Sequence, residues 1–181
     1  AADDAYPMTL RVPELGVDVT WHSASEVSGI DAGPVQPWSA ELPRLYDATV
    51  ASTGETVRLR LGFRTVEIAG DRLLVNGERL VFHGMNRHET HPDRGRVFDE
   101  DWARADLLLM KRSNVNAIRT SHYPPHPRLL DLADELGLWV ILECDLETHG
   151  FEPGGWRDNP SDDPAWREAL LDRIERTVER D

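Results

Sequence analysis

The densest group of chemically active side chains lies in the C-terminal half, directly after an apolar segment. Glu143, Asp145, Glu147 and His149 alternate along residues 143–149. In an extended backbone, alternate residues project from one face, which would gather three carboxylates and an imidazole in a small volume. Such a group needs a cation, a proton or a basic partner to offset its repulsion. Glu147 and His149 are therefore candidate ligands of Mg²⁺; the alternative is a solvated acidic loop.

A second group centres on Arg119 and His122, within residues 119–125. A guanidinium can hold a carboxylate through two parallel hydrogen bonds, and the imidazole can donate to a hydroxyl-rich ligand. The alternative role for Arg119 is to pair with the acidic residues 143–149. Both roles can hold at once.

Other reactive patterns are weaker. The histidines of His88-Glu89-Thr90-His91 are three residues apart, whereas the zinc-protease motif needs a spacing of four on a helix. Pro92 follows at once and is hostile to a helix interior, so a metalloprotease is excluded.

We expect His91 and His126 to be ordinary surface residues. Trp156 is a candidate for stacking on a sugar ring, with packing inside its own loop as the favoured alternative.

Alternating strands and helices must position these groups. Apolar patterns and capping residues predict the order βαβαβα after about residue 80. The strands are predicted over 81–85, 115–118 and 138–142, and the helices over 99–112, over 127–136 and from Asp163-Pro164 onward.

The connections between these elements are unequal in length. Those that leave helices are minimal, whereas those that leave strands are long and cover about 86–98, 119–126 and 143–162. In parallel α/β folds the site lies at the carboxyl ends of the strands. Five of the seven histidines fall in these three loops: His88, His91, His122, His126 and His149. This edge of the sheet is the candidate site.

The first 70 residues have the period-two pattern of antiparallel strands, clearest over 10–12, 17–21 and 56–61. The segment 33–38 is too rich in proline for a central strand. A hairpin is predicted around Asn76-Gly77, a pair suited to a type I′ turn. The fold class is therefore α/β with a β part, the β part resembling a portion of an antiparallel sandwich.

Composition excludes several classes of function. The 181 residues carry 33 acidic and 20 basic side chains, a net charge of −13, which argues against nucleic acid as a partner. No apolar run is long enough to cross a membrane. Cys144 is the single cysteine, and Ala1-Ala2-Asp3-Asp4 has no feature of a signal peptide, so we expect a cytoplasmic location.

The ordered motifs resemble the β-galactosidases of glycoside hydrolase family 2, over roughly residues 35–181. Three motifs carry the resemblance: Gly84-Met85-Asn86-Arg87-His88-Glu89 with His91-Pro92, Arg119-Thr120-Ser121-His122-Tyr123-Pro124, and Glu147-Thr148-His149-Gly150. Supporting matches are Pro37-Trp38-Ser39-Ala40-Glu41, Leu61-Gly62-Phe63-Arg64, Leu74-Val75-Asn76-Gly77 and Leu108-Leu109-Met110-Lys111.

This resemblance implies part of an immunoglobulin-like β-sandwich over 1–65, then over 66–181 the first three βα units of a (β/α)₈ TIM barrel. It implies retaining hydrolysis of β-galactosides such as lactose by a bacterial enzyme, with a homo-oligomeric full-length protein. The roles it implies are transition-state stabilisation and sugar binding for His88 and His122, nucleophile support for Arg119, and ligation of Mg²⁺ by Glu147 and His149, with Na⁺ as a further candidate ion.

The sequence also departs from the family. The acid/base glutamate is expected in an Asn-Glu pair after a fourth strand, and the nucleophile further on, but no Asn-Glu pair follows Glu147. Three βα units occupy about 100 residues, whereas a closed barrel needs about 250. We therefore expect an incomplete, inactive piece of a longer enzyme. The alternatives are a non-catalytic carbohydrate-binding or interaction module, and a β-glucuronidase-type relative.

Overall fold

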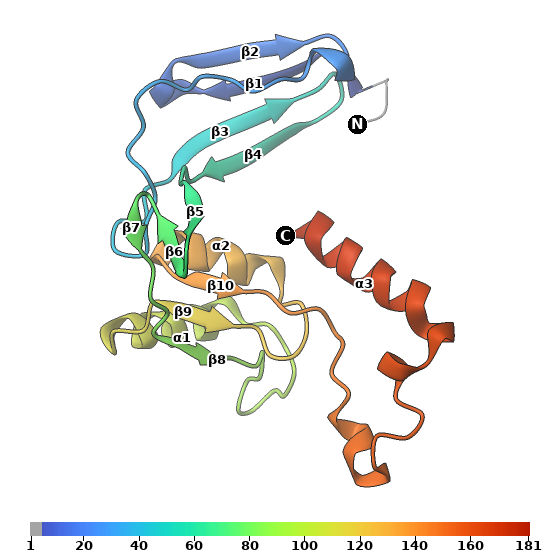
Figure 1. The fold of residues 1–181 in the computed structure, drawn as a ribbon. Coiled ribbons are helices and arrows are strands. Elements are labelled where there is room, and N and C mark those ends of the chain that lie inside the picture. Colours follow the sequence, from blue (N-terminus) through green and yellow to red (C-terminus); the bar gives the residue numbers. More distant parts are fainter. Residues whose placement is uncertain (1–4) are drawn as a thin grey trace. The chain divides into compact units, whose positions relative to one another are not determined.

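A computed structural model describes residues 5–181. Residues 1–4, on which the expectation about a signal peptide depends, lie outside this range. The chain forms two compact units, one ending at Leu80 and the other running from Val81 to Asp181, and each is described separately below (Figure 1).

The first unit contains a four-stranded antiparallel sheet in the order β2-β1-β3-β4. Its three predicted strands are confirmed, and β3 completes it between β1 and β4. Sequence patterning does not single out β3, because its alanines have a low strand propensity. The elements are β1 (Met8–Val12), η2 (Pro13–Leu15), β2 (Val17–Trp21), η3 (Ala24–Glu26), β3 (Tyr46–Ala51) and β4 (Thr56–Leu61).

One face of this sheet carries a small core. Val12, Tyr46 and Ala48 are buried there, and the Phe63 ring meets the Tyr46 ring edge-on at a centroid distance of 5.5 Å. The proline-rich segment 33–38 is irregular, as predicted, and helps to cover this core: the Gln36 N–H donates to the Tyr46 hydroxyl at 2.8 Å.

A separate three-stranded sheet follows, in the order β5-β6-β7. The predicted turn is confirmed, because Asn76 and Gly77 have φ values of 52° and 83°, both in the left-handed region that a type I′ turn requires. The last strand has only two residues. The elements are β5 (Val66–Ala69), β6 (Arg72–Val75) and β7 (Glu78–Arg79).

The second unit has the predicted alternation of strands and helices. Its sheet is parallel, in the order β10-β9-β8, and the helices α1 and α2 connect its strands (Figure 1). Each strand is shifted or shortened by one to three residues from its prediction. The elements are β8 (Gly84–Asn86), α1 (Glu100–Arg112), β9 (Ala117–Arg119), α2 (Pro127–Leu136), β10 (Trp139–Ile141), η4 (His149–Gly154), η5 (Pro160–Asp162), η6 (Pro164–Trp166) and α3 (Arg167–Arg180).

Local signals explain why α1 and α2 begin and end where predicted. The Asp99 carboxylate caps α1 by accepting from the Trp102 N–H at 2.8 Å. Pro127 occupies the first turn of α2, where its missing N–H costs nothing. Gly137 ends α2 with a φ of 76°, a conformation that favours glycine.

The core of this unit lies between α1, α2 and the parallel sheet. Leu107 of α1, Ile118 of β9 and Leu132 of α2 are almost completely buried. Strands β8 and β9 approach closely, since a Cβ atom on Gly84 would lie 3.2 Å from Ala117. Small residues at this point therefore allow the strands to pair.

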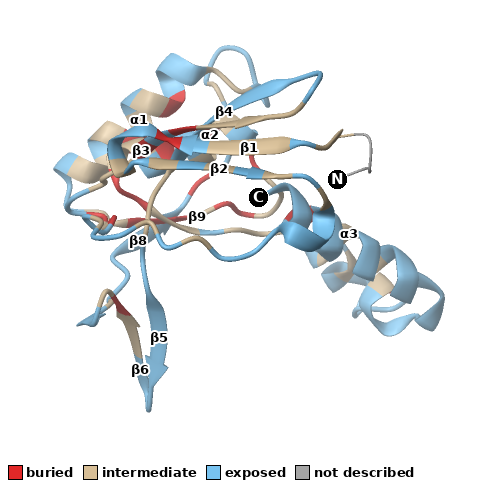
Figure 2. Cartoon of the chain, turned by 90° about the horizontal axis from the view of Figure 1, so that it is seen from above, coloured by how far each residue is buried: buried red, intermediate tan, exposed pale blue. Residues whose placement is uncertain are grey.

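The region after β10 departs from the predictions. Ile141, the last residue of β10, is 46% exposed. The last helix was predicted from Asp163-Pro164, but the short η6 comes first and α3 starts only at Arg167. Figure 2 shows that α3 is mostly exposed, and its apolar residues Ile174 and Val178 are 44% and 72% exposed. No helix in the described part is long and apolar enough to cross a membrane.

We predict that Leu107→Ala lowers the free energy of unfolding by about 3 kcal/mol, because it leaves a cavity between α1 and α2. The matched change Leu109→Ala, on the same helix but 63% exposed, should alter it by less than about 0.5 kcal/mol. Urea unfolding measures the difference, with wild type and both variants made with the same first and last residues. Equal losses would contradict this account of the core.

The cap of α1 predicts a pH dependence. The Trp102 N–H and the neighbouring Arg94 hold the pKa of the Asp99 carboxyl below its usual value. Its contribution to stability is therefore complete above the usual aspartate pKa of about 4 and is lost as the pH falls through the lower pKa of the folded state. Asp99→Ala should lower the melting temperature more at pH 7 than at pH 3, whereas Asp99→Asn retains a capping oxygen and should lower it less. A gap between wild type and Asp99→Ala that stays constant with pH would contradict this explanation.

Candidate active site

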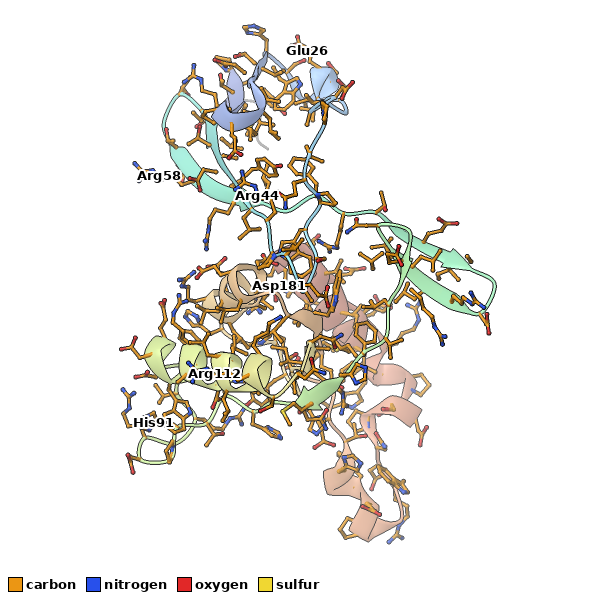
Figure 3. All side chains as sticks on the ribbon, turned by 90° about the vertical axis from the view of Figure 1, so that its left-hand side faces the viewer. Glu26, Arg44, Arg58, His91, Arg112 and Asp181 are labelled. Carbon is orange, nitrogen blue, oxygen red and sulfur yellow. The ribbon has the colours of Figure 1, made fainter. Side chains whose placement is uncertain are left out.

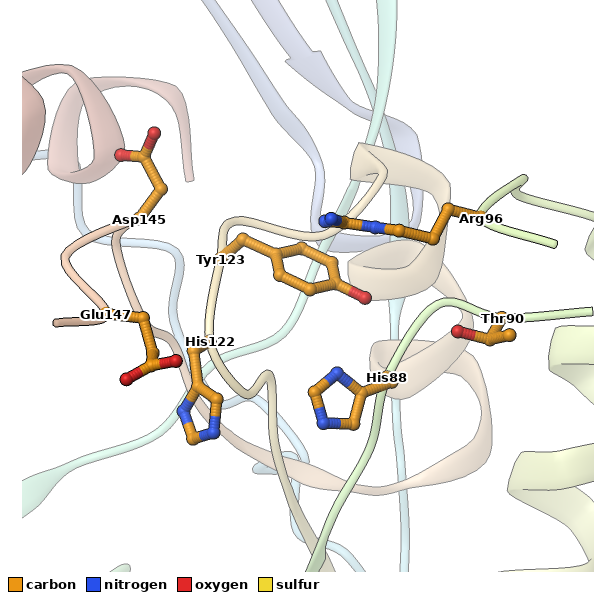
Figure 4. A pocket seen from close by; sticks show the side chains of 7 residues that line it. All are labelled: His88, Thr90, Arg96, His122, Tyr123, Asp145 and Glu147. Carbon is orange, nitrogen blue, oxygen red and sulfur yellow. The ribbon is translucent and has the colours of Figure 1, made fainter. Parts of the chain in front are cut away.

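A cleft of about 390 Å³ lies at the carboxyl ends of the parallel strands, the edge predicted from the loop lengths. It is formed by the three loops that leave β8, β9 and β10. Figure 4 shows the side chains that line it: His88, Thr90, Arg96, His122, Tyr123, Asp145 and Glu147.

The two histidines of the cleft come from adjacent loops. The His88 and His122 rings meet edge-on, with centroids 5.7 Å apart, and the Tyr123 ring lies 6.0 Å from His88. The Tyr123 hydroxyl accepts from the Glu89 N–H at 2.8 Å, which ties the loop after β9 to the loop after β8. Two imidazoles and a phenol therefore face a shared space, where they can bind the hydroxyl groups of a polar ligand.

The backbone that leads into His88 is held in place by the preceding residue, Arg87. The Arg87 N–H donates to the Arg119 carbonyl at 2.9 Å and continues the pairing of β8 with β9. The Arg87 side chain is buried, and its Nε donates to Asp106 of α1 at 3.3 Å. A buried arginine held at both its backbone and its side chain leaves little freedom to the residue that follows it.

Arg119 and His122 share one carboxylate. Glu143 Oε1 accepts from Arg119 Nε at 2.6 Å, and Glu143 Oε2 lies 3.0 Å from His122 Nδ1. Arg119 Nη1 also lies 3.4 Å from the Asn86 side-chain oxygen at the end of β8. The pairing of Arg119 with the acidic loop, one of the two alternatives from the sequence, is thus present.

The other predicted pair, Glu147 and His149, forms a local contact. The His149 N–H donates to Glu147 Oε1 at 2.8 Å, and His149 Nδ1 lies 2.5 Å from the same oxygen. The backbone hydrogen bond, with smaller contributions from the His149 imidazole, holds the pKa of the Glu147 carboxyl below its usual value. Trp156 is 42% exposed, and its ring centroid lies 6.2 Å from that of His149. Only Glu147 of these three lines the cleft.

A carboxylate and an imidazole on one loop are donors of a kind that Mg²⁺ accepts. However, within residues 5–181 no three His, Cys, Asp or Glu side chains come together as a group that could hold a metal ion. The pair thus agrees in type with a metal site and does not complete one. Further ligands would have to come from water or from residues beyond this chain.

The extended backbone that would align Glu143, Asp145, Glu147 and His149 on one face does not persist, although Asp145 and Glu147 both line the cleft. The strand ends at Ile141, and the backbone then turns, with the Leu146 N–H donating to the Cys144 carbonyl. Each carboxylate consequently has its own partner: Glu143 binds Arg119 and His122, Asp145 binds Arg173 of α3 at 2.5 Å, and Glu147 contacts His149.

Besides His149, two further histidines of the loops do not line the cleft. His91 lies on the loop beside α1, with its ring 5.1 Å from that of Trp102 (Figure 3). His126 caps α2, accepting from the Arg128 N–H at 3.2 Å, and its ring stacks on Phe98. Both residues have local structural contacts.

Arg96 and Tyr123 were not predicted as site residues, and Glu143 was predicted only as one member of the acidic group 143–149. Arg96 lies over the Tyr123 ring, 4.4 Å from its centroid, and both residues line the cleft. Glu143 bonds to Arg119 and His122 and so connects the end of β9 to the segment after β10. The position of Arg96 and Tyr123 in two of the long loops was a usable signal, but the partners of Glu143 depend on the strand register.

The comparison with protein families decides the classification. The sequence profile described as "Glycosyl hydrolases family 2, TIM barrel domain" matches residues 66–181, more than half of the chain. The chain belongs to glycosyl hydrolase family 2. The ordered motifs around His88, Arg119 and Glu147 are therefore those of a family 2 protein, as their resemblance indicated.

Two relatives with similar sequences are β-galactosidases. The β-galactosidase of Arthrobacter sp. (strain B7) is 71% identical over 177 residues, 98% of this chain and 17% of the relative. That of Pectobacterium atrosepticum is 44% identical over 168 residues, 90% of this chain and 16% of the relative. The chain thus spans about one sixth of the length of these relatives.

Solved family 2 structures share the fold. A β-glucuronidase of Faecalibacterium prausnitzii is 30% identical with a TM-score of 0.66, over 76% of this chain and 23% of that one. A family 2 β-galacturonidase of Eisenbergiella tayi, bound to galacturonate, is 31% identical with a TM-score of 0.61, over 74% and 25% of the two chains.

Proposed function

We propose that this chain is part of a β-galactosidase that removes terminal, non-reducing β-D-galactose residues from β-galactosides such as lactose, with retention of configuration. The observation that carries the proposal is the cleft in which His88 and His122 meet at the carboxyl ends of parallel strands, in a family 2 chain. The 71% identity to a β-galactosidase supports galactose as the sugar.

The proposed architecture is part of a sandwich followed by part of a barrel; the compact units of the structure divide at Leu80, later than the proposed boundary. The β1–β4 sheet belongs to an immunoglobulin-like sandwich, with a domain boundary near residue 65, and β8 to α3 form the first three βα units of a (β/α)₈ barrel. Strands β8 and β10 each end the parallel sheet, and an edge strand leaves unpaired backbone groups that further strands would satisfy. Closure into a barrel removes such edges.

In this proposal the cleft binds the sugar and stabilises the transition state. The His88 and His122 imidazoles contact sugar hydroxyls as the ring flattens toward an oxocarbenium ion. Arg119, beyond its bond to Glu143, offers positive charge to the nucleophilic carboxylate. That carboxylate attacks the anomeric carbon while a second, protonated glutamate donates to the leaving oxygen; water then releases the sugar, and the second residue takes up its proton. Both glutamates are supplied by the longer protein.

Glu147 and His149 are proposed as two ligands of Mg²⁺, with Na⁺ as a further candidate ion. The pair has suitable donor atoms on one loop beside the cleft. When bound, the cation would fix and acidify the neighbouring acid/base carboxyl. Trp156 is proposed as a stacking surface for the sugar or for the group attached to it; it is partly exposed and does not itself line the cleft.

A β-glucuronidase is the second candidate. Arg96 lines the cleft, and its guanidinium could pair with the carboxylate of a uronic acid. Structural similarity to a β-glucuronidase and to a β-galacturonidase supports this alternative.

A non-catalytic carbohydrate-binding module is the third candidate, since it requires no catalytic glutamates. A cytoplasmic location and a homo-oligomeric state of the full-length protein complete the proposal.

We predict that the full-length protein hydrolyses o-nitrophenyl β-D-galactoside at least 100-fold more efficiently, in kcat/KM, than the corresponding glucuronide. The isolated 181-residue chain should hydrolyse neither, because it lacks both catalytic glutamates. Release of nitrophenol measures both activities. A preference for the glucuronide would favour the second candidate, binding of galactose without any turnover by the full-length protein would favour the third, and turnover by the isolated chain would contradict the assignment of the glutamates.

For the metal, we predict that Glu147→Ala in the full-length protein weakens the dependence of activity on Mg²⁺. Loss of one carboxylate ligand should raise the Mg²⁺ concentration for half-maximal activity by at least 10-fold. Activity is measured across a Mg²⁺ titration after removal of metal with a chelator. Glu152→Ala, an exposed glutamate five residues further on, is the matched control and should leave the titration unchanged. An unchanged titration for Glu147→Ala would refute this ligand assignment.

A further inference from the structure

One carboxylate organises the two cationic side chains at the end of β9. Glu143 Oε1 accepts from Arg119 Nε at 2.6 Å, and Arg119 Nη2 contacts the same oxygen. Glu143 Oε2 lies 3.0 Å from His122 Nδ1. The two oxygens of a single side chain thus hold the guanidinium and the imidazole at once.

The backbone beneath this carboxylate is fixed as well. The Glu143 N–H donates to the Thr120 hydroxyl at 3.0 Å, and the Thr120 N–H donates to the Ile141 carbonyl at 3.1 Å. Thr120 and Ser121 are buried, so water competes little for these bonds. Glu143 is therefore held against the end of β9 from both its main chain and its side chain.

This contact determines which nitrogen of His122 remains for a ligand. A carboxylate only accepts hydrogen bonds, so the nitrogen that faces it, Nδ1, must carry a proton. Nε2 is then an acceptor in the neutral ring and a donor in the protonated ring. Arg119 Nη2 lies farther from Nδ1, at 3.4 Å, and as a donor it cannot replace the carboxylate in this role.

The other acidic side chains of residues 143–149 do not replace Glu143 as a partner of His122 and Arg119, because each has a partner of its own. Asp145 is bonded to Arg173 of α3, and Glu147 is in contact with His149. Among the carboxylates of residues 143–149, Glu143 alone bonds to His122 or Arg119 in the structure.

We propose that Glu143 is a positioning residue of the active site, which fixes the tautomer and orientation of His122 and the direction of Arg119. The proposal rests on the proposed function of the cleft, since it assigns Glu143 to the same catalytic step as those two side chains. Glu143 itself acts through its neighbours and does not contact the reacting atoms.

The test uses the full-length enzyme and whichever nitrophenyl glycoside the wild type hydrolyses. Glu143→Gln retains the size of the side chain but loses its charge and one acceptor. We expect kcat to fall by about 100-fold with KM changed by less than threefold, because a misplaced His122 weakens the transition state more than the bound substrate. Glu143→Asp keeps the charge on a shorter stem and should recover part of the lost kcat.

The matched control is Glu135→Gln. Glu135 of α2 is another half-buried glutamate that binds two cationic groups, Arg104 and Arg128, both at 2.9 Å, and it does not line the cleft. Its substitution should lower the melting temperature and leave kcat within twofold of wild type. The pair of variants thus separates positioning from a general loss of stability.

A double-mutant cycle identifies the residue through which Glu143 acts. In a His122→Asn background, Glu143→Gln should lower kcat by less than 10-fold, because the side chain that it orients is already gone. The same cycle in an Arg119→Ala background tests the second partner. Multiplication of the losses in full in both backgrounds would overturn the proposal, and so would a Glu143→Gln enzyme with wild-type kcat. If Glu143→Gln does not fold, Glu143→Asp is carried through the same cycle. A wild type that hydrolyses no glycoside overturns the proposed function instead, which keeps the two failures distinct.

Discussion

The register of the parallel sheet is the constraint on which the site depends. Gly84, Ala117 and Trp139 form one row across β8, β9 and β10, and Asn86, Arg119 and Ile141 form the row two residues further on. The three strands therefore end together, and their loops must begin at the same edge. Parallel strands cannot be joined by tight turns. The helices α1 and α2 must therefore return the chain to the opposite edge of the sheet before each new strand begins. The apolar contacts of α1, α2 and β9 are thus what hold the loops in position.

Electrostatics then determines how the loops are arranged. A chain with a net charge of −13 brings several carboxylates to one edge, and each one described here is bound to a different partner. The guanidinium of Arg119 comes from the neighbouring strand and that of Arg173 from the following helix. Distribution of the carboxylates among separate partners avoids the repulsion that a common face would create. His122 is thereby held by a directed hydrogen bond to Glu143.

Features that depend on neighbours in the chain were predictable from the sequence. The ends of α1 and α2 follow from Asp99, Pro127 and Gly137, and the hairpin follows from Asn76-Gly77, because caps and turns are local. Strand boundaries shifted because pairing depends on distant residues. The edge that carries the cleft could be inferred from loop lengths alone. The pairing of Arg119 with one of the acidic residues 143–149 was anticipated as an alternative. That Glu143 binds both Arg119 and His122 was not, since the two partners lie more than 20 residues away and meet it only through the register.

The unequal lengths of the connections have a consequence for evolution. The connections that lead from helices into strands, at Ser113-Asn114 and Gly137, are short. The residues of the cleft lie on the long loops that leave the strands, at the opposite edge of the sheet. Substitutions near Arg96 or Tyr123 can therefore alter the lining of the cleft while the packing of Leu107, Ile118 and Leu132 is left intact. Divergence of substrate choice at constant fold is what such a separation permits, and the galactosidases, glucuronidases and galacturonidase related to this chain are named for different sugars.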